Sequence, residues 1–198
     1  MLARIKRFRE YLRLSGVAGI SRRYFVLNSF DGAMTMLGII LGASATGHAD
    51  PKFVIGAGLG ASFAMGVSGF SGAYLTERAE RKGRLRRLRR AMLSDLRSTV
   101  HAKASFAASI WAALIDGTSP AIAAAMPMIP YALTLFQIAP SWLAFPVSML
   151  SILATLFVLG AFLGKISREN VLMAGLRMLA VGLVTAVIVW AFGGFRIG

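Results

Sequence analysis

The sequence predicts an all-α membrane protein with five transmembrane helices. Of its 198 residues, 57% are hydrophobic and 15% are charged, whereas soluble domains are about 45–50% apolar and about 25% charged. The apolar residues are concentrated in five runs, and a run of about 20 spans a bilayer. The net charge is +14, but the basic residues lie between the apolar runs, which argues against a nucleic-acid partner. The chain has no cysteine, which excludes disulfides and thiolate metal sites.

The N-terminal segment 1–23 is basic and amphipathic. Ile5, Phe8 and Leu12 fall on one helical face, and arginines and a lysine surround the rest. This pattern is typical of a helix that lies on an anionic membrane surface. The segment lacks the apolar core of a signal peptide, and its small residues at 15–20 predict a break before the first span.

The five spans are predicted within a single domain that covers residues 24–194. Their ranges are about 24–47, 52–76, 104–136, 142–163 and 171–192. The second span is rich in glycine. The third contains three prolines, which membrane helices tolerate where neighbouring groups satisfy the freed backbone. Residues 77–103 form a basic connector, whose apolar residues recur at helical spacing and predict another amphipathic surface helix.

The basic residues fall on one side of the predicted membrane. The segments before the first span, between the second and third, and around the last turn hold 20 of the 22 lysines and arginines. The positive-inside rule therefore places the N-terminus in the cytoplasm and the C-terminus outside. A short chain without a targeting peptide indicates a multi-pass protein of a prokaryotic inner membrane.

The first span carries a carboxylate, Asp31, inside an otherwise apolar run. A charge within the bilayer is costly and usually functional. An aspartate binds a cation only when it is deprotonated, so a metal ion and a proton compete for it. Asp31 is therefore a candidate metal ligand and proton carrier. The alternative is an aspartate that bonds to Asn28 or Ser29 at a helix interface.

Methionine side chains provide candidate soft ligands. Met34 lies three residues after Asp31 on the same helical face, Met36 is turned away, and Met65 lies near the middle of the second span. Thioethers favour softer metals and disfavour Mg²⁺ and Ca²⁺. Met34 and Met65 are therefore candidates for the transport path, although methionine is also a common apolar filler.

Further acids lie at the end of the second span and within the third. Glu77 and Glu80 share one helical face and are candidates to collect cations at the cytosolic mouth. The alternative for both is ion pairing with Arg78, Arg81 and Arg84. Asp116, near the middle of the third span, is a candidate second carboxylate of the path.

Other polar residues are better explained by structure than by transport. Arg177, near the start of the fifth span, is expected to snorkel or to pair with an acid. His48, Asp50 and His101 are expected to be turn and interface residues.

Three segments together resemble the vacuolar iron transporter family. NSFDGAMTMLGIILGA (28–43) is similar to its first-helix Asp-Gly motif, and GAYLTERAERK (72–82) is similar to the end of its second helix. MPMIPYAL (126–133) and residues 157–194 are similar to its third helix and last helical hairpin. The chain departs from the family at Ala73, where a glutamate or glycine is common, and at Gly69, where many members carry methionine. It is a short form, because its basic connector replaces the Glu-rich cytosolic metal-binding domain of eukaryotic members.

The resemblance implies a secondary transporter rather than an enzyme, without a cofactor. It implies export of Fe²⁺ or Mn²⁺ from the cytosol in exchange for protons. It also implies a homodimer in which Asp31 faces a path between the subunits. Anionic lipid is the expected partner of the basic segments. The alternative is a non-transporting membrane protein that docks lipid or a partner through its basic helices.

Overall fold

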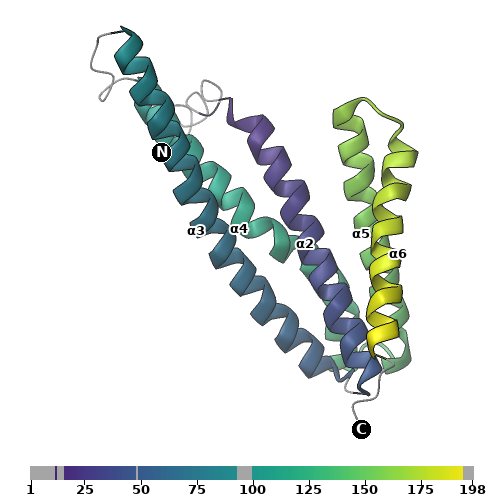
Figure 1. Cartoon of the computed structure of the whole chain (residues 1–198). Coiled ribbons are helices and arrows are strands. Elements are labelled where there is room, and N and C mark those ends of the chain that lie inside the picture. The colour runs from purple at the N-terminus through teal and green to yellow at the C-terminus, as the bar shows by residue number, and fades with distance from the viewer. Residues whose placement is uncertain (1–11, 13–15, 48, 93–99, 194–198) are drawn as a thin grey trace. The chain divides into compact units, whose positions relative to one another are not determined.

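The computed structural model describes residues 12, 16–47, 49–92 and 100–193 (Figure 1). In this part of the chain the elements are α2 (Val17–Ala45), α3 (Pro51–Met92), α4 (Val100–Leu135), α5 (Ser141–Ser167) and α6 (Val171–Gly193). Each contains a stretch long and apolar enough to cross a membrane, and the described residues include no strand. The predicted fold class is thus confirmed. Residues 1–11, which hold most of the predicted N-terminal surface helix, lie outside the described residues.

Helix α2 begins earlier than the sequence predicts. It starts at Val17 rather than Tyr24, so the expected break over residues 15–20 is wrong for most of its length. Val17 is buried with Ala108 and Ala112, and Ile20 packs against this cluster. Burial of Val17 and Ile20 outweighs the weak helix propensity of Gly19 between them. Packing supplies most of the stability of a helix in a folded protein.

Helix α3 continues well beyond the second span. The helix predicted in the connector is present up to Met92, but it continues α3 without interruption instead of forming a separate element. At 42 residues, α3 has about twice the length that a membrane span requires. Ion pairs from Glu77 to Arg81 and from Glu80 to Arg84 connect successive turns of this extension, and such pairs stabilise helices. Residues 93–99 of the connector lie outside the described residues.

The chain divides into two compact units, and helices α2, α3 and α4 each contribute to both. Unit 1 contains the chain up to Phe25 together with Gly66–Thr118, and unit 2 contains Val26–Met65 and Ser119–Gly198. Glu77, Glu80 and Asp116 belong to unit 1. Asp31, Met34 and Met65 belong to unit 2.

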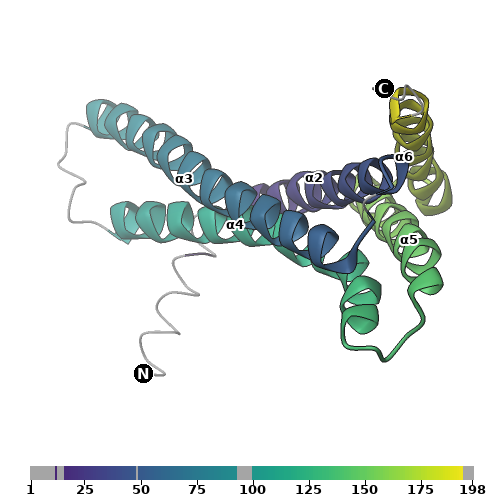
Figure 2. The ribbon, with the colours of Figure 1, turned by 90° about the horizontal axis from the view of Figure 1, so that it is seen from below.

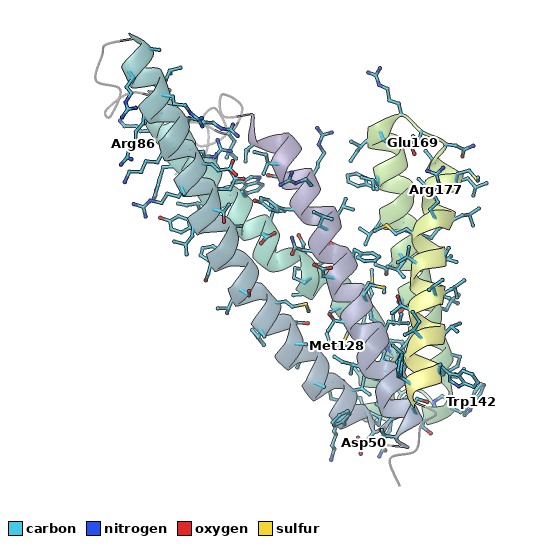
Figure 3. All side chains as sticks on the ribbon, in the orientation of Figure 1. Asp50, Arg86, Met128, Trp142, Glu169 and Arg177 are labelled. Atoms are coloured by element: carbon cyan, nitrogen blue, oxygen red, sulfur yellow. The ribbon has the colours of Figure 1, made fainter. Side chains whose placement is uncertain are left out.

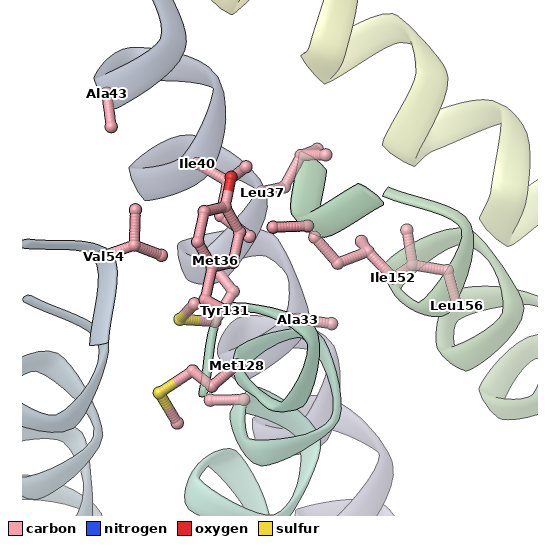
Figure 4. Close-up of a cluster of buried hydrophobic side chains, with 12 residues drawn as sticks. Ala33, Met36, Leu37, Ile40, Ala43, Val54, Met128, Tyr131, Ile152 and Leu156 are labelled. Atoms are coloured by element: carbon pink, nitrogen blue, oxygen red, sulfur yellow. The ribbon is translucent and has the colours of Figure 1, made fainter. Parts of the chain in front are cut away.

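The core of unit 2 is built from buried side chains of α2, α3, α4 and α5 (Figure 4). Met36, Ile40 and Tyr131 are among its largest fully buried side chains. Helix α4 passes through this unit with prolines inside it. The Ser148 hydroxyl donates a hydrogen bond of 2.7 Å to the carbonyl of Pro127. A side chain of a neighbouring helix therefore satisfies a backbone oxygen within the proline-containing segment of α4.

Helices α5 and α6 form an antiparallel hairpin and lie side by side (Figures 1 and 2). Arg168 ends α5 in a left-handed conformation with φ of 58°. The Asn170 side chain then accepts a hydrogen bond of 3.0 Å from the backbone N–H of Leu172 in the first turn of α6. Arg168 thus ends α5, and the Asn170 side chain caps the start of α6 a few residues later, which gives the short turn of the hairpin.

Gly32 permits a close approach between α2 and α4 in unit 2. A Cβ atom at this position would collide with the backbone of Pro120. We expect Gly32→Ala to destabilise the protein by about 1–3 kcal/mol, because backbone atoms cannot move aside as a flexible side chain can. Thermal unfolding in detergent measures the effect. Gly56→Ala is the matched control, since a Cβ there meets nothing within 4 Å; an equal loss in both variants would contradict this packing.

Candidate metal path

Asp31 lies on the exposed side of α2. The buried face of this helix carries Val26, Ser29, Ala33 and Met36, and Asp31 falls outside that face. Its side chain is therefore exposed on the surface of the single chain, whereas the sequence suggests a buried acid. Within the described residues its carboxylate has no hydrogen bond or ion pair.

The expected alternative for Asp31, a bond to Ser29, is not found. The Ser29 hydroxyl instead donates a hydrogen bond of 3.4 Å to the carbonyl oxygen of Ser119. Ser29 thereby connects α2 to α4 on the buried face. Asp31 is left as a carboxylate on the outer face of an apolar helix.

The face of α2 that carries Asp31 also presents small and polar residues. Thr35, Gly38 and Gly42 follow Asp31 at intervals of four, three and four residues, which places all of them on one side of the helix. A Cβ atom at Gly38 or Gly42 would meet nothing within 4 Å. This surface, defined by Asp31, Thr35, Gly38 and Gly42, is the Asp31 face.

Met65 approaches the Asp31 face through Thr35. The Thr35 hydroxyl donates a hydrogen bond to Met65 Sδ over 3.6 Å, one helical turn from Asp31. Both residues belong to unit 2, so a thioether from α3 lies beside the helix that carries the carboxylate. The sequence singles out Met65 but gives no signal for Thr35, because a lone threonine in a span has no distinctive spacing.

The other methionines of unit 2 differ in burial. Met34 is half-buried and packs against the apolar core, and Met36 is within it. A Cβ atom at Gly58 would lie 2.7 Å from Met128 Sδ and 2.8 Å from Met36 Sδ. Met36 therefore fills the core, as its position away from Asp31 predicts.

Glu77 is buried in unit 1 and is held by two side chains. Its Oε2 accepts a hydrogen bond of 3.1 Å from Arg81 Nε, and its Oε1 accepts one of 3.3 Å from the Tyr24 hydroxyl. Glu77 and Arg81 are only 5% and 7% exposed. The ion pair anticipated as an alternative to cation collection is thus present. Tyr24 has no signal in the sequence, since its contact joins residues 53 positions apart.

Glu80 has a different environment one turn away. It forms an ion pair with Arg84 at 3.4 Å, and both side chains are more than half exposed. Exposed pairs of this kind contribute about 0–1 kcal/mol. Glu80 is therefore accessible to ions in solution, whereas Glu77 is not.

Asp116 is the second buried acid of unit 1, with 7% of its surface exposed. A Cβ atom at Gly69 would lie 2.9 Å from Asp116 Oδ2. The absence of a side chain at Gly69 thus leaves room for this carboxylate. Gly69 is the position where the family resemblance leads us to expect methionine, and any side chain there would lie against Asp116.

The remaining polar residues have structural roles. Asp50 accepts a hydrogen bond of 2.7 Å from the backbone N–H of Lys52 at the start of α3. Arg177 pairs with Glu169 at 3.4 Å beside the α5–α6 turn (Figure 3), which confirms the predicted pairing. His48 and the side chain of His101 lie outside the described residues.

No group of three or more histidine, aspartate or glutamate side chains in the described part of a single chain could hold a metal ion. The candidate residues gather in smaller sets instead. Asp31, Thr35 and Met65 lie along unit 2, and Tyr24, Glu77 and Arg81 are joined in unit 1.

Comparisons with known proteins agree with the resemblance seen in the sequence. A profile of the VIT family matches residues 84–194, which is more than half of the chain and includes Asp116. An uncharacterised protein of Methanocaldococcus jannaschii is 36% identical over 169 residues, covering 84% of this chain and 85% of the relative. No solved structure matches the chain. The chain is thus a multi-pass membrane protein that belongs to the VIT family, the vacuolar iron transporter family of metal-ion transporters.

Proposed function

We propose that this protein exports a divalent transition metal, Fe²⁺ or Mn²⁺ or both, from the cytosol in exchange for protons. The observation that carries this proposal is Asp31, a carboxylate exposed on an apolar membrane helix. A carboxylate facing lipid is costly. Asp31 therefore needs a polar environment that the described part of one chain does not supply.

A second copy of the chain provides that environment in the proposed mechanism. Gly38 and Gly42 on the Asp31 face allow close approach of another helix, as small residues at this spacing do. Two-fold association brings the same face of both chains together, and hence two Asp31 carboxylates. Met65 adds a thioether beside this face. A site with two carboxylates and a soft sulfur ligand suits Fe²⁺ and Mn²⁺ better than it suits Mg²⁺ or Ca²⁺, which prefer oxygen ligands alone.

Proton exchange follows from the same carboxylates. A metal ion binds them only in their deprotonated form, so protons from the far side of the membrane promote metal release. The positive-inside distribution of lysine and arginine supports a cytoplasmic N-terminus. In that orientation Glu80 lies toward the cytosol, where its exposed carboxylate collects cations, and Asp116 is proposed as a further carboxylate of the path.

The basic extension of α3 is proposed to contact anionic lipid. Its described basic side chains are mostly exposed, and Figure 3 labels Arg86 among them. Each lysine or arginine close to an anionic surface contributes about 1 kcal/mol of attraction. The same exposed charges favour the alternative function, a membrane protein that docks lipid or a partner without transporting metal.

A transport panel in proteoliposomes separates these functions. We expect uptake of Fe²⁺ or Mn²⁺ into inside-out vesicles, accelerated when the lumen is acidic, and no uptake of Mg²⁺ or Ca²⁺. The expected rate increase with the proton gradient reflects competition between protons and metal at the carboxylates. Protein-free vesicles serve as the control. Absence of flux for every metal tested would contradict transport and favour the docking function.

A further inference from the structure

Both oxygens of the Glu77 carboxylate accept a hydrogen bond from another side chain. Arg81 Nε donates to one oxygen at 3.1 Å and the Tyr24 hydroxyl donates to the other at 3.3 Å. The Glu77 and Arg81 side chains are 7% and 8% exposed. Burial and the adjacent guanidinium of Arg81 therefore disfavour binding of a metal ion to Glu77 in this conformation.

The ion pair between Glu77 and Arg81 leaves part of the guanidinium without a partner. Arg81 contacts Glu77 through Nε, whereas a strong arginine–carboxylate pair uses two parallel hydrogen bonds. Arg81 Nη2 is buried and has no hydrogen-bond partner among the described residues. A buried donor without an acceptor requires an explanation in a native structure. An arginine that changes partners during a transport cycle provides one.

Electrostatics makes Arg81 a competitor of metal. The guanidinium places a positive charge beside the Glu77 carboxylate. A divalent cation approaching the same carboxylate is attracted by Glu77 and repelled by Arg81. The neighbouring ion pair of Glu80 with Arg84 has the same i, i+4 spacing but is largely exposed. Water and salt screen that second pair strongly.

We propose that Arg81 is an internal counter-ion that occupies Glu77 in the metal-free protein, and that a divalent cation loads Glu77 by displacing it. This inference rests on the proposed transport function. Arg81 is a positioning residue, because it acts on the metal through Glu77 rather than by binding it. The Tyr24 hydroxyl donates a hydrogen bond to the second oxygen of Glu77.

The test compares the KM for Mn²⁺ uptake in charge-neutral and charge-conserving variants. We expect Arg81→Gln to lower KM by about ten-fold, since one charge within about 4–6 Å changes the proton affinity of a carboxylate by this order or more. Arg81→Lys keeps the charge and is expected to hold KM within about two-fold of wild type. Arg86→Gln, which removes an exposed charge from the same extension of α3, is the control and is expected to change KM by less than about two-fold.

The effect must depend on Glu77. In a Glu77→Gln background, Arg81→Gln is expected to produce no further change in KM, because the carboxylate for which metal and arginine compete is gone. A KM for Arg81→Gln that equals or exceeds the wild-type value overturns the proposal and leaves a purely structural ion pair. A decrease in KM that persists in the Glu77→Gln background overturns it as well.

A measurement on the wild-type protein tests the role of Arg81 without relying on variants that must fold correctly. Dicarbonyl modification of arginine, mapped by peptide mass spectrometry, reports whether Arg81 is accessible. We expect saturating Mn²⁺ to increase modification of Arg81 several-fold and to leave the exposed Arg84 unchanged. Unchanged Arg81 modification overturns the inference. Absence of Mn²⁺ uptake by the wild type contradicts the transport function itself, whereas normal uptake with an unchanged KM in Arg81→Gln contradicts only the role of Arg81.

Discussion

Asp31→Asn is expected to reduce the initial rate of Mn²⁺ or Fe²⁺ uptake by at least about 100-fold. Loss of a group that merely supports a metal ligand costs about 10–100-fold in affinity or activity, so loss of the ligand's own charge should reach the upper end. The amide is nearly isosteric with the carboxylate, and Asp31 makes no hydrogen bond or ion pair within the described residues. The fold should therefore survive the substitution. Uptake into proteoliposomes, normalised to folded protein, measures the effect.

Asp50→Asn is the matched control for this substitution. Asp50 lies in the turn before α3, where it accepts a backbone hydrogen bond, and asparagine caps helices about as well as aspartate. Uptake by Asp50→Asn should remain within about two-fold of wild type. If Asp31→Asn took up metal at the rate of the wild-type protein, the Asp31 carboxylate would have no role in transport.

Gly38→Leu is expected to convert a dimer to a monomer and to reduce metal uptake with it. A Cβ at Gly38 meets nothing within 4 Å in its own chain, so a larger side chain fits the isolated chain. In the proposed dimer the same position contacts the second copy. Overpacking of a close interface costs about 1–3 kcal/mol, which weakens association roughly ten-fold or more. Light scattering of the protein in detergent measures its mass.

The control for Gly38→Leu adds the same bulk away from the Asp31 face. Ala180 is exposed on α6, and Ala180→Leu should leave both mass and uptake unchanged. A Gly38→Leu protein that remains dimeric and transports metal normally would show that the Asp31 face is not the interface between copies.

The sequence predicts the helices well where composition determines them. The apolar runs are long, so the existence of five spans follows from hydropathy alone. The ends are less predictable. Val17 and Ile20 belong to α2 because they pack against alanines of α4, a contact between residues far apart in the sequence. The extension of α3 to Met92 follows from the absence of a strong helix breaker, although amphipathic spacing suggests a separate surface helix.

The candidate residues are identified from the sequence, but their environments are not. An acid in an apolar run draws attention to Asp31, yet only the arrangement of the helices shows which side of α2 is buried. Spacing along one helix suggests the pair of Glu77 with Arg81, whereas the contact with Tyr24 requires the fold. The close fit of Asp116 against Gly69 likewise depends on the packing of two helices. Local patterns therefore find the charged groups, and tertiary contacts decide which are available to a metal ion.

Equilibrium binding of Mn²⁺ to the purified protein tests the central claim most directly. If two Asp31 carboxylates share one ion across a two-fold interface, the Mn²⁺ whose binding depends on Asp31 is expected to amount to about one ion per two chains, with protons released as the metal binds. Asp31→Asn should lose this component while Asp50→Asn retains it. A component of one ion or more per chain that depends on Asp31, or binding that is unchanged in Asp31→Asn, would contradict a shared site at Asp31.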